Sequence, residues 1–200
     1  MSDPEIYSFA QAAFVLREPV REVRRTVERR NIQYHLVSFG GRKVRAMDRK
    51  TLVFLSWSRE QRDLLSAELW RTFYESVLGL EQLPSRIDAG GLTARFADAS
   101  KRVQARLKTL RELEGQVARN ASGETVLEGT EIEVHRIAAL LNGGMTIDEV
   151  IEDYPSLNPD QVAFAQAYAA AHPKPGRPYP GITAKAAMRQ ADFSGLDLDN

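Results

Sequence analysis

The chain has 200 residues, of which 43% are hydrophobic and 27% are charged, and it contains no cysteine. This composition suits one large folded domain or two small ones, and it excludes a disulfide framework and a thiolate metal site. No apolar run approaches the roughly 20 residues that a membrane-spanning helix needs. Because residues 1–8 also show no signal-peptide pattern, we expect a cytoplasmic protein.

Charge is distributed unevenly along the chain, although the formal net charge is zero. Residues 1–50 hold eleven lysine and arginine residues against six aspartate and glutamate residues. Residues 120–172 hold one arginine against nine acidic residues. Phosphate backbones attract the first segment and repel the second, so we expect nucleic acid at the N-terminal end and a different partner for the rest.

Residues 7–30 carry the pattern of two short helices joined by a tight turn. Ser8 and Gln11 form a capping box at the start of the first helix, and Pro19 opens the second. Apolar residues repeat at helical spacing along one face of each helix. The opposite face of the second helix is basic and consists of Arg21, Arg24, Arg25 and Arg29.

Residues 32–47 are predicted to form a β-hairpin with its turn at Gly40 and Gly41. The second strand of this hairpin carries three cations, Arg42, Lys43 and Arg45. Asp48 then stands where it can cap a following helix. Two helices and a basic hairpin in succession are the outline of a DNA-reading module.

This N-terminal segment resembles the winged helix of MerR-type regulators and phage excisionases. Three residues of this segment differ from the family pattern. Two are in the turn, where Arg17 and Glu18 stand in place of glycine and an aliphatic residue. A third is Gln11, which stands in place of an acidic residue. The resemblance rests on Ser8, Gln11, Ala12, Ala13, Leu16, Val23, Val27, Ile32, Gly41, Arg42, Lys43, Val44, Arg45 and Leu52.

The resemblance implies that the second helix enters the major groove and that the hairpin is a wing against the backbone or the minor groove. The implied DNA-binding residues are Arg21, Arg24, Arg25, Arg29, Arg42, Lys43 and Arg45. An alternative is a solvated helix face in which the arginines pair with Glu18, Glu22 and Glu28. Arg30 and Arg49 are expected to be solvated.

The middle of the chain is expected to be a helical linker or dimerisation region, residues 57–119. Periodicity predicts one amphipathic helix over residues 59–78 and a second over residues 97–119. Glycine and proline predict a loop between them, at residues 81–91, and residues 120–123 read as a hinge. Because many DNA-binding proteins of this kind act on paired half-sites, we expect a homodimer.

Residues 129–173 contain three short helical patterns with start signals at each joint. Thr146 with Glu149 and Asn158 with Gln161 form capping boxes, and short strands are expected at residues 125–127 and 132–134. This stretch resembles a small helix-turn-helix domain, long described as a domain of unknown function, that is found in VapB-type antitoxins. The matching residues are Gly129, Thr130, Ile132, Val134, Ile137, Leu140, Leu141, Gly144, Met145, Thr146, Ile151, Asp153, Tyr154, Pro155, Leu157 and residues 165–168.

Residues 173–200 are rich in proline and glycine, which disfavour regular structure and indicate an extended segment. The alternative is a tail without a partner, or one that packs on a dimer mate. VapB-type antitoxins neutralise a PIN-like ribonuclease toxin with such a tail, and the resemblance implies this role here. The implied toxin-binding residues are Lys174, Arg177, Tyr179, Lys185 and Arg189. Arg177 is the first candidate, because a cation can enter an acidic nuclease site.

Catalytic and metal motifs are not apparent in the sequence. His35, His135 and His172 have no metal-ligand spacing, and no phosphate-binding loop or catalytic triad order occurs. Acidic residues in 148–153 are expected to form a solvated face that keeps this unit away from DNA. We therefore expect no enzymatic activity, no metal and no cofactor.

Together these patterns predict a mainly α protein of four segments. These are a winged helix-turn-helix at residues 1–56, a helical region at 57–119, a three-helix unit with short strands at 120–172 and an extended tail at 173–200. The predicted function is an antitoxin that neutralises a PIN-like ribonuclease and represses its own promoter. The alternative is a stand-alone MerR- or excisionase-like transcription regulator without a toxin.

Overall fold

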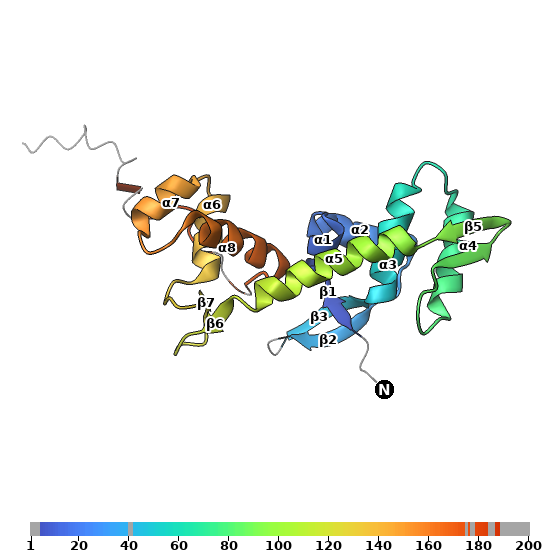
Figure 1. Ribbon diagram of the computed structural model, residues 1–200, viewed down its shortest axis with the longest axis horizontal. Helices are drawn as coiled ribbons and strands as arrows, with labels where there is room; N and C mark the ends of the chain where they lie inside the picture. Colours follow the sequence, from blue (N-terminus) through green and yellow to red (C-terminus); the bar gives the residue numbers. More distant parts are fainter. Residues whose placement is uncertain (1–4, 40–41, 175, 177–178, 184–186, 189–200) are drawn as a thin grey trace, which may run out of the picture. The chain divides into compact units, whose positions relative to one another are not determined.

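The computed structural model describes residues 5–39, 42–174, 176, 179–183 and 187–188 (Figure 1). The chain divides into two compact units, an N-terminal unit of residues 1–112 and a C-terminal unit of residues 113–200. Both are mainly helical and contain small antiparallel sheets, which confirms the predicted fold class.

The N-terminal unit begins with a three-stranded antiparallel sheet and two short helices. The strand order is β1-β3-β2, with Ile6 opposite Asp48 at one edge and His35 opposite Ala46 at the other. The predicted pairing of the two hairpin strands is therefore confirmed, and a third strand extends the sheet. The predicted turn at Gly40 and Gly41 lies outside the described residues. The elements are β1 (Ile6–Ser8), α1 (Phe9–Leu16), α2 (Val20–Arg30), β2 (His35–Phe39), β3 (Arg42–Asp48) and α3 (Arg49–Glu60).

The turn between α1 and α2 is built by an arginine in an unusual backbone conformation. Arg17 is left-handed, with φ 54°, a region that glycine occupies more readily. The backbone N–H of Glu18 donates to the carbonyl of Ala13 at 3.0 Å and closes the turn. At the other end of α1, the predicted capping box of Ser8 and Gln11 is confirmed.

The predicted single helix over residues 59–78 is wrong, because two helices share this stretch. Helix α3 ends at Glu60, and α4 (Ala67–Leu78) begins after Ser66. The Ser66 hydroxyl accepts a hydrogen bond from the Leu69 backbone N–H at 3.1 Å, and this cap starts a new helix. In a single helix over residues 59–78, Leu64 would lie on the apolar face, whereas its side chain is 76% exposed in the structure.

The predicted loop at residues 81–91 is also wrong in its second half. Strands β4 (Arg86–Ala89) and β5 (Leu92–Arg95) form an antiparallel hairpin. Gly90 and Gly91 have φ values of 57° and 76°, as the two-residue turns that fit strand twist require.

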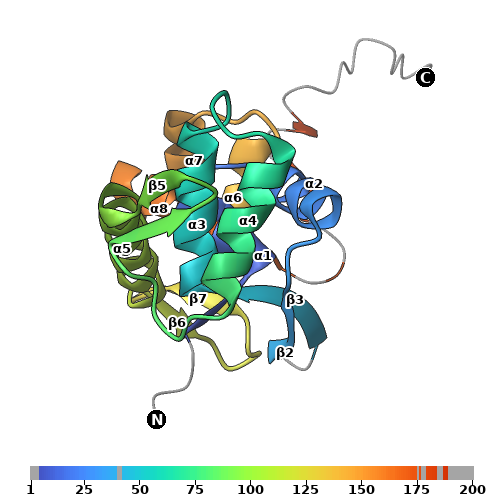
Figure 2. The same cartoon turned by 90° about the vertical axis from the view of Figure 1, so that its right-hand side faces the viewer.

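An aromatic cluster forms the core between α3 and α4, which pack against each other (Figure 2). Phe54 is fully buried and has ring centroids of Trp70, Tyr74 and Trp57 within 5.0, 5.4 and 5.7 Å. Phe96, just ahead of α5 (Ala97–Glu114), completes the cluster. This core holds α3 and α4 together, and α3 also packs against α1.

The predicted helix over residues 97–119 extends too far. Helix α5 ends at Glu114, and β6 (Val117–Arg119) pairs with β7 (Thr125–Leu127) in a hairpin. The predicted hinge at residues 120–123 is the turn of this hairpin. There the Asn120 side-chain oxygen accepts hydrogen bonds from two backbone N–H groups, those of Ser122 and Glu124.

Three helices complete the C-terminal unit: α6 (Val134–Asn142), α7 (Ile147–Asp153) and α8 (Pro159–Ala171). Both predicted capping boxes, at the starts of α7 and α8, are confirmed. The predicted strand at residues 132–134 is wrong, because only Glu133 makes a β-bridge, with Val126, before α6 begins. Apolar side chains with no exposed surface form the core: Val134, Ile137, Leu140, Val150, Val162 and Ala165.

Candidate functional site

The exposed face of α2 carries the four arginines that the sequence analysis singled out. Val23 and Val27, on the opposite face, are buried and hold the helix against the rest of the N-terminal unit. Glu22 neutralises part of the basic face, because its carboxylate lies 3.1 Å from Arg25 Nη1 and 3.7 Å from Arg21 Nε. The alternative of a solvated, ion-paired face therefore describes Arg21 and Arg25 correctly.

The β2–β3 hairpin lies next to α2 and is joined to it by an ion pair. Arg45 Nη1 lies 3.2 Å from Glu28 Oε1, and the Arg45 guanidinium also stands over the Tyr34 ring, 5.0 Å from its centroid. Because side chains alternate along a strand, Lys43 shares the face of Arg45, whereas Arg42 lies on the other face. Arg42 and Lys43 are both exposed.

Four of the seven predicted DNA-binding residues have no ion-pair partner among the described residues. Their charges are therefore available to an anion from outside, whereas those of the other three are already shared with glutamates. All seven belong to one helix and the adjoining hairpin. The four are Arg24, Arg29, Arg42 and Lys43.

Beside α2, a cleft of about 830 Å³ is open between the α1–α2 turn, α2 and the α3–α4 connection. Sequence reasoning missed its contributions from Arg59 and Arg62, because a continuous helix over residues 59–78 would have made them ordinary surface residues. The signal was Ser66, whose capping role interrupts that helix. Six arginines line the cleft: Arg17, Arg25, Arg29, Arg30, Arg59 and Arg62.

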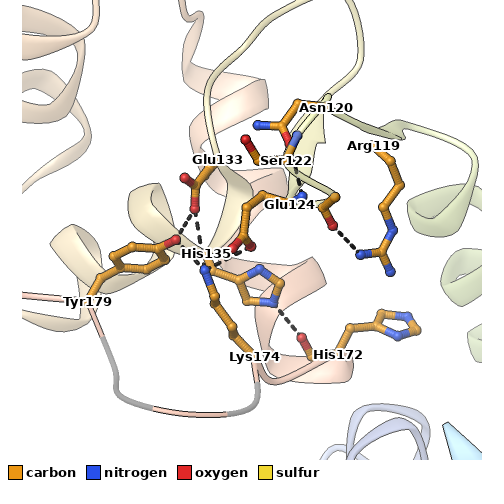
Figure 3. A network of polar contacts seen from close by, with 10 residues as sticks. Arg119, Asn120, Ser122, Glu124, Glu133, His135, His172, Lys174 and Tyr179 are labelled. Carbon is orange, nitrogen blue, oxygen red and sulfur yellow. Dashed lines mark hydrogen bonds and ion pairs between the residues drawn. The ribbon is translucent and has the colours of Figure 1, made fainter. Parts of the chain in front are cut away.

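In the C-terminal unit, two predicted toxin-binding residues meet two glutamates (Figure 3). Lys174 Nζ lies 2.8 Å from Glu124 Oε2 and 3.5 Å from Glu133 Oε2, and Tyr179 donates a hydrogen bond to Glu133. Lys174 also donates to the Tyr179 hydroxyl oxygen. The other three predicted residues, Arg177, Lys185 and Arg189, lie outside the described residues.

Lys174 and Glu124 stabilise each other's charged forms. The hydrogen bond from Lys174 lowers the pKa of Glu124. Burial acts to lower the pKa of Lys174, but its hydrogen bond to Glu124 and the charges of Glu124 and Glu133 raise it overall. Lys174 is therefore held in its charged form by carboxylates of its own unit.

Residues 180–183 cross α6 without regular structure of their own. Arg136 of α6 donates hydrogen bonds to the carbonyls of Pro180 at 3.0 Å and Ile182 at 3.3 Å. Gly181 packs so closely on Gly143 that a Cβ atom on Gly143 would lie 2.0 Å from the Gly181 carbonyl oxygen. The Thr183 hydroxyl donates to Asp153, so this part of the tail is bound to its own unit.

Two histidines form a partly buried contact next to this cluster. His135 Nε2 lies 2.6 Å from the carbonyl oxygen of His172, whose ring stacks on Tyr168 and lies 3.1 Å from Glu114. Burial lowers the pKa of His172, with Glu114 acting to raise it and His135 to lower it. The two rings therefore have structural partners.

Within residues 5–188, apart from the gaps given above, no group of three acidic or histidine side chains is arranged to hold a metal ion. In the same ranges, every helix is too short or too polar to cross a bilayer.

The family comparison concerns the C-terminal unit. A family model described as "Protein of unknown function (DUF433)" matches residues 118–169. The chain is also similar to the "Uncharacterized protein y4eO" of Sinorhizobium fredii, with 34% identity over 55 residues, 28% of this chain and 25% of that protein. The chain thus matches about a quarter of the length of that relative. No solved structure matches the chain. Residues 118–169 are therefore similar to a family of unknown function, and the antitoxin and helix-turn-helix assignments stay predictions.

Proposed function

We propose that this chain is a DNA-binding repressor and antitoxin, which contacts duplex DNA through α2 and the β2–β3 hairpin and holds a PIN-like ribonuclease toxin with its tail. One observation carries the DNA-binding part. Four exposed cations without ion-pair partners in the described residues lie on one helix and the adjoining hairpin: Arg24, Arg29, Arg42 and Lys43.

The dimensions of α2 suit a groove of DNA. Its eleven residues give a length of roughly 16 Å, and the major groove admits an α-helix. The hairpin then lies beside it as a wing whose cations reach the phosphate backbone. The glutamate pairs of Arg21, Arg25 and Arg45 are on the surface, where ion pairs are weak, so phosphates compete with them.

The antitoxin part rests on the similarity of residues 118–169 to the family of unknown function and on the tail. Lys174 and Tyr179 already bind carboxylates in their own unit, those of Glu124 and Glu133. A nuclease site rich in carboxylates offers the same chemistry. Toxin binding would exchange one set of carboxylates for the other, with Arg177, Lys185 and Arg189 adding further contacts.

A stand-alone regulator is the second candidate, and one observation favours it. Lys174, Pro180 and Ile182 of the tail contact Glu124, Glu133 and Arg136 of their own unit, and these contacts need no toxin. Co-purification with the product of the adjacent gene discriminates the two candidates. Under the antitoxin proposal, Arg177→Glu weakens inhibition of that product. Undiminished inhibition removes Arg177 from the role.

Fluorescence anisotropy with duplex DNA from upstream of the gene tests DNA binding. The variant Arg24→Ala/Arg29→Ala/Lys43→Ala should bind weakly, with a salt slope reduced by about three, one per lost phosphate contact. The matched control removes three exposed cations elsewhere in the same unit that likewise have no ion-pair partner among the described residues, with Arg71→Ala/Arg95→Ala/Lys101→Ala. Equal losses in the two variants would contradict the proposed surface.

A further inference from the structure

The cleft beside α2 has a composition that the proposed function does not require. We propose that it binds a small organic anion, a molecule with a carboxylate, phosphate or sulfonate group on a flat apolar body. The volume of about 830 Å³ lies in the range of small-molecule sites. All lining residues belong to the N-terminal unit.

The charge around the cleft is incompletely balanced. Its two acidic residues are both engaged, because Glu18 lies 2.6 Å from Arg59 and Glu22 lies 3.1 Å from Arg25. The other arginines have no carboxylate partner among the residues that the structure describes. Cations gathered on a concave surface reinforce one another's potential and attract an anion. These arginines are Arg17, Arg29, Arg30 and Arg62.

The floor of the cleft indicates that the anion has an apolar part. It is formed by aliphatic side chains and one aromatic ring, and the guanidinium of Arg30 lies 5.1 Å from the Trp70 ring centroid. A phosphodiester backbone gains little from such a floor, whereas a flat organic body buries its surface there. The apolar lining residues are Leu16, Pro19, Val23, Leu55, Leu65, Ala67 and Trp70.

The walls are held in place without a ligand. Arg59 donates a hydrogen bond to the carbonyl of Leu16 at 2.6 Å, which fixes the α1–α2 turn to the end of α3. Arg25 and Arg29 line the cleft and also belong to the proposed DNA surface. An anion bound here would therefore compete with DNA, a consequence that rests on the proposed function, whereas anion binding itself does not.

Titration of the full chain with anilinonaphthalene sulfonate, an aromatic anion that fluoresces when bound, tests the site directly and without DNA. We expect saturable binding at one site and quenching of tryptophan emission, because Trp70 lines the cleft. The variant Arg30→Gln/Arg62→Gln should bind at least about tenfold more weakly, the effect of losing charge-assisted hydrogen bonds. The control Arg86→Gln/Lys101→Gln, outside the cleft, should bind like the parent. Equal affinity in the two variants, or no saturable binding, overturns the proposal.

A second variant tests the apolar floor, with circular dichroism to verify folding. Leu65 is only partly buried, so the uncharged variant Leu65→Asn should fold and should weaken binding of the dye. Inorganic pyrophosphate supplies charge without an apolar body, and we expect it to bind at least about tenfold more weakly than the dye. Unchanged dye binding in Leu65→Asn, or pyrophosphate binding as tight as that of the dye, overturns the assignment to an organic anion.

Discussion

Arg45 of the hairpin lies 3.2 Å from Glu28 of α2, and this ion pair links the two elements of the proposed DNA surface. Both side chains are largely exposed, at 44% and 66%, so the pair contributes at most about 1 kcal/mol to stability. Its larger effect is electrostatic, because Glu28 neutralises the charge of Arg45, which would otherwise be available to DNA. The pair therefore limits the basic potential of this surface.

Glu28→Gln should raise DNA affinity by about two- to fivefold at low salt, because it releases Arg45 and removes a negative charge from the surface. Fluorescence anisotropy measures the change. As a control, Glu112→Gln removes an exposed acid of α5, whose carboxylate lies 3.7 Å from Lys108. Weaker binding by Glu28→Gln would mean that the ion pair orients the hairpin, contrary to this prediction.

Gly143→Ala should release the tail from α6 without unfolding the C-terminal unit. The φ of Gly143 is −79°, which alanine adopts easily, but the new methyl group would overlap the carbonyl of Gly181. We expect changed amide NMR chemical shifts at Ile182 and Thr183, whose surroundings change when the contact is lost, and unchanged hydrogen-exchange protection within α8. Gly79→Ala is the matched control, because its φ is −73° and no atom lies within 4 Å of the added methyl group. Unchanged chemical shifts at Thr183 would show that the tail does not depend on this contact.

His172 should make the C-terminal unit less stable in mild acid. Its pKa is lowered in the folded state, mainly by burial, so the unfolded chain takes up the proton first as pH falls through the ordinary value of 6.5. The stability is fully present above that value and declines below it. Urea unfolding followed by the NMR signals of the Tyr168 ring, at about pH 7.5 and about pH 5.5, measures this decline.

His172→Gln should remove most of that dependence on pH, because glutamine does not titrate. His35→Gln is the control, since His35 lies on an exposed position of the other unit. An equal decline in His172→Gln and in the parent chain would assign the effect to other groups.

The features predicted correctly from the sequence depend on neighbours within a few residues. The capping boxes at Ser8, Thr146 and Asn158 are of this kind, because the cap and its partner are three residues apart. The helix boundary at Ser66 was missed because Leu64 and Leu65 preserve a helical period across it. The hairpin at residues 86–95 and the strand at residues 117–119 were missed because these strands are only three or four residues long, whereas the strand at residues 125–127 was predicted.

The sites were predicted less completely, because their chemistry depends on residues far apart in the chain. The sequence places basic residues on α2 and on the hairpin, but not the pairing of Arg45 with Glu28. The cleft needs α3 and α4 to fold beside α2, which no local pattern reports. The contact of Gly143 with Gly181 likewise joins a helix end to a tail thirty-eight residues later.

The salt dependence of DNA binding tests the central claim most directly. If α2 and the hairpin make roughly six phosphate contacts, the logarithm of the association constant should fall with the logarithm of salt concentration at a slope of about −5. The Arg24→Ala/Arg29→Ala/Lys43→Ala variant should reduce that slope to about −2. A flat response in the parent chain, or the same slope in the variant, would contradict DNA binding through this surface.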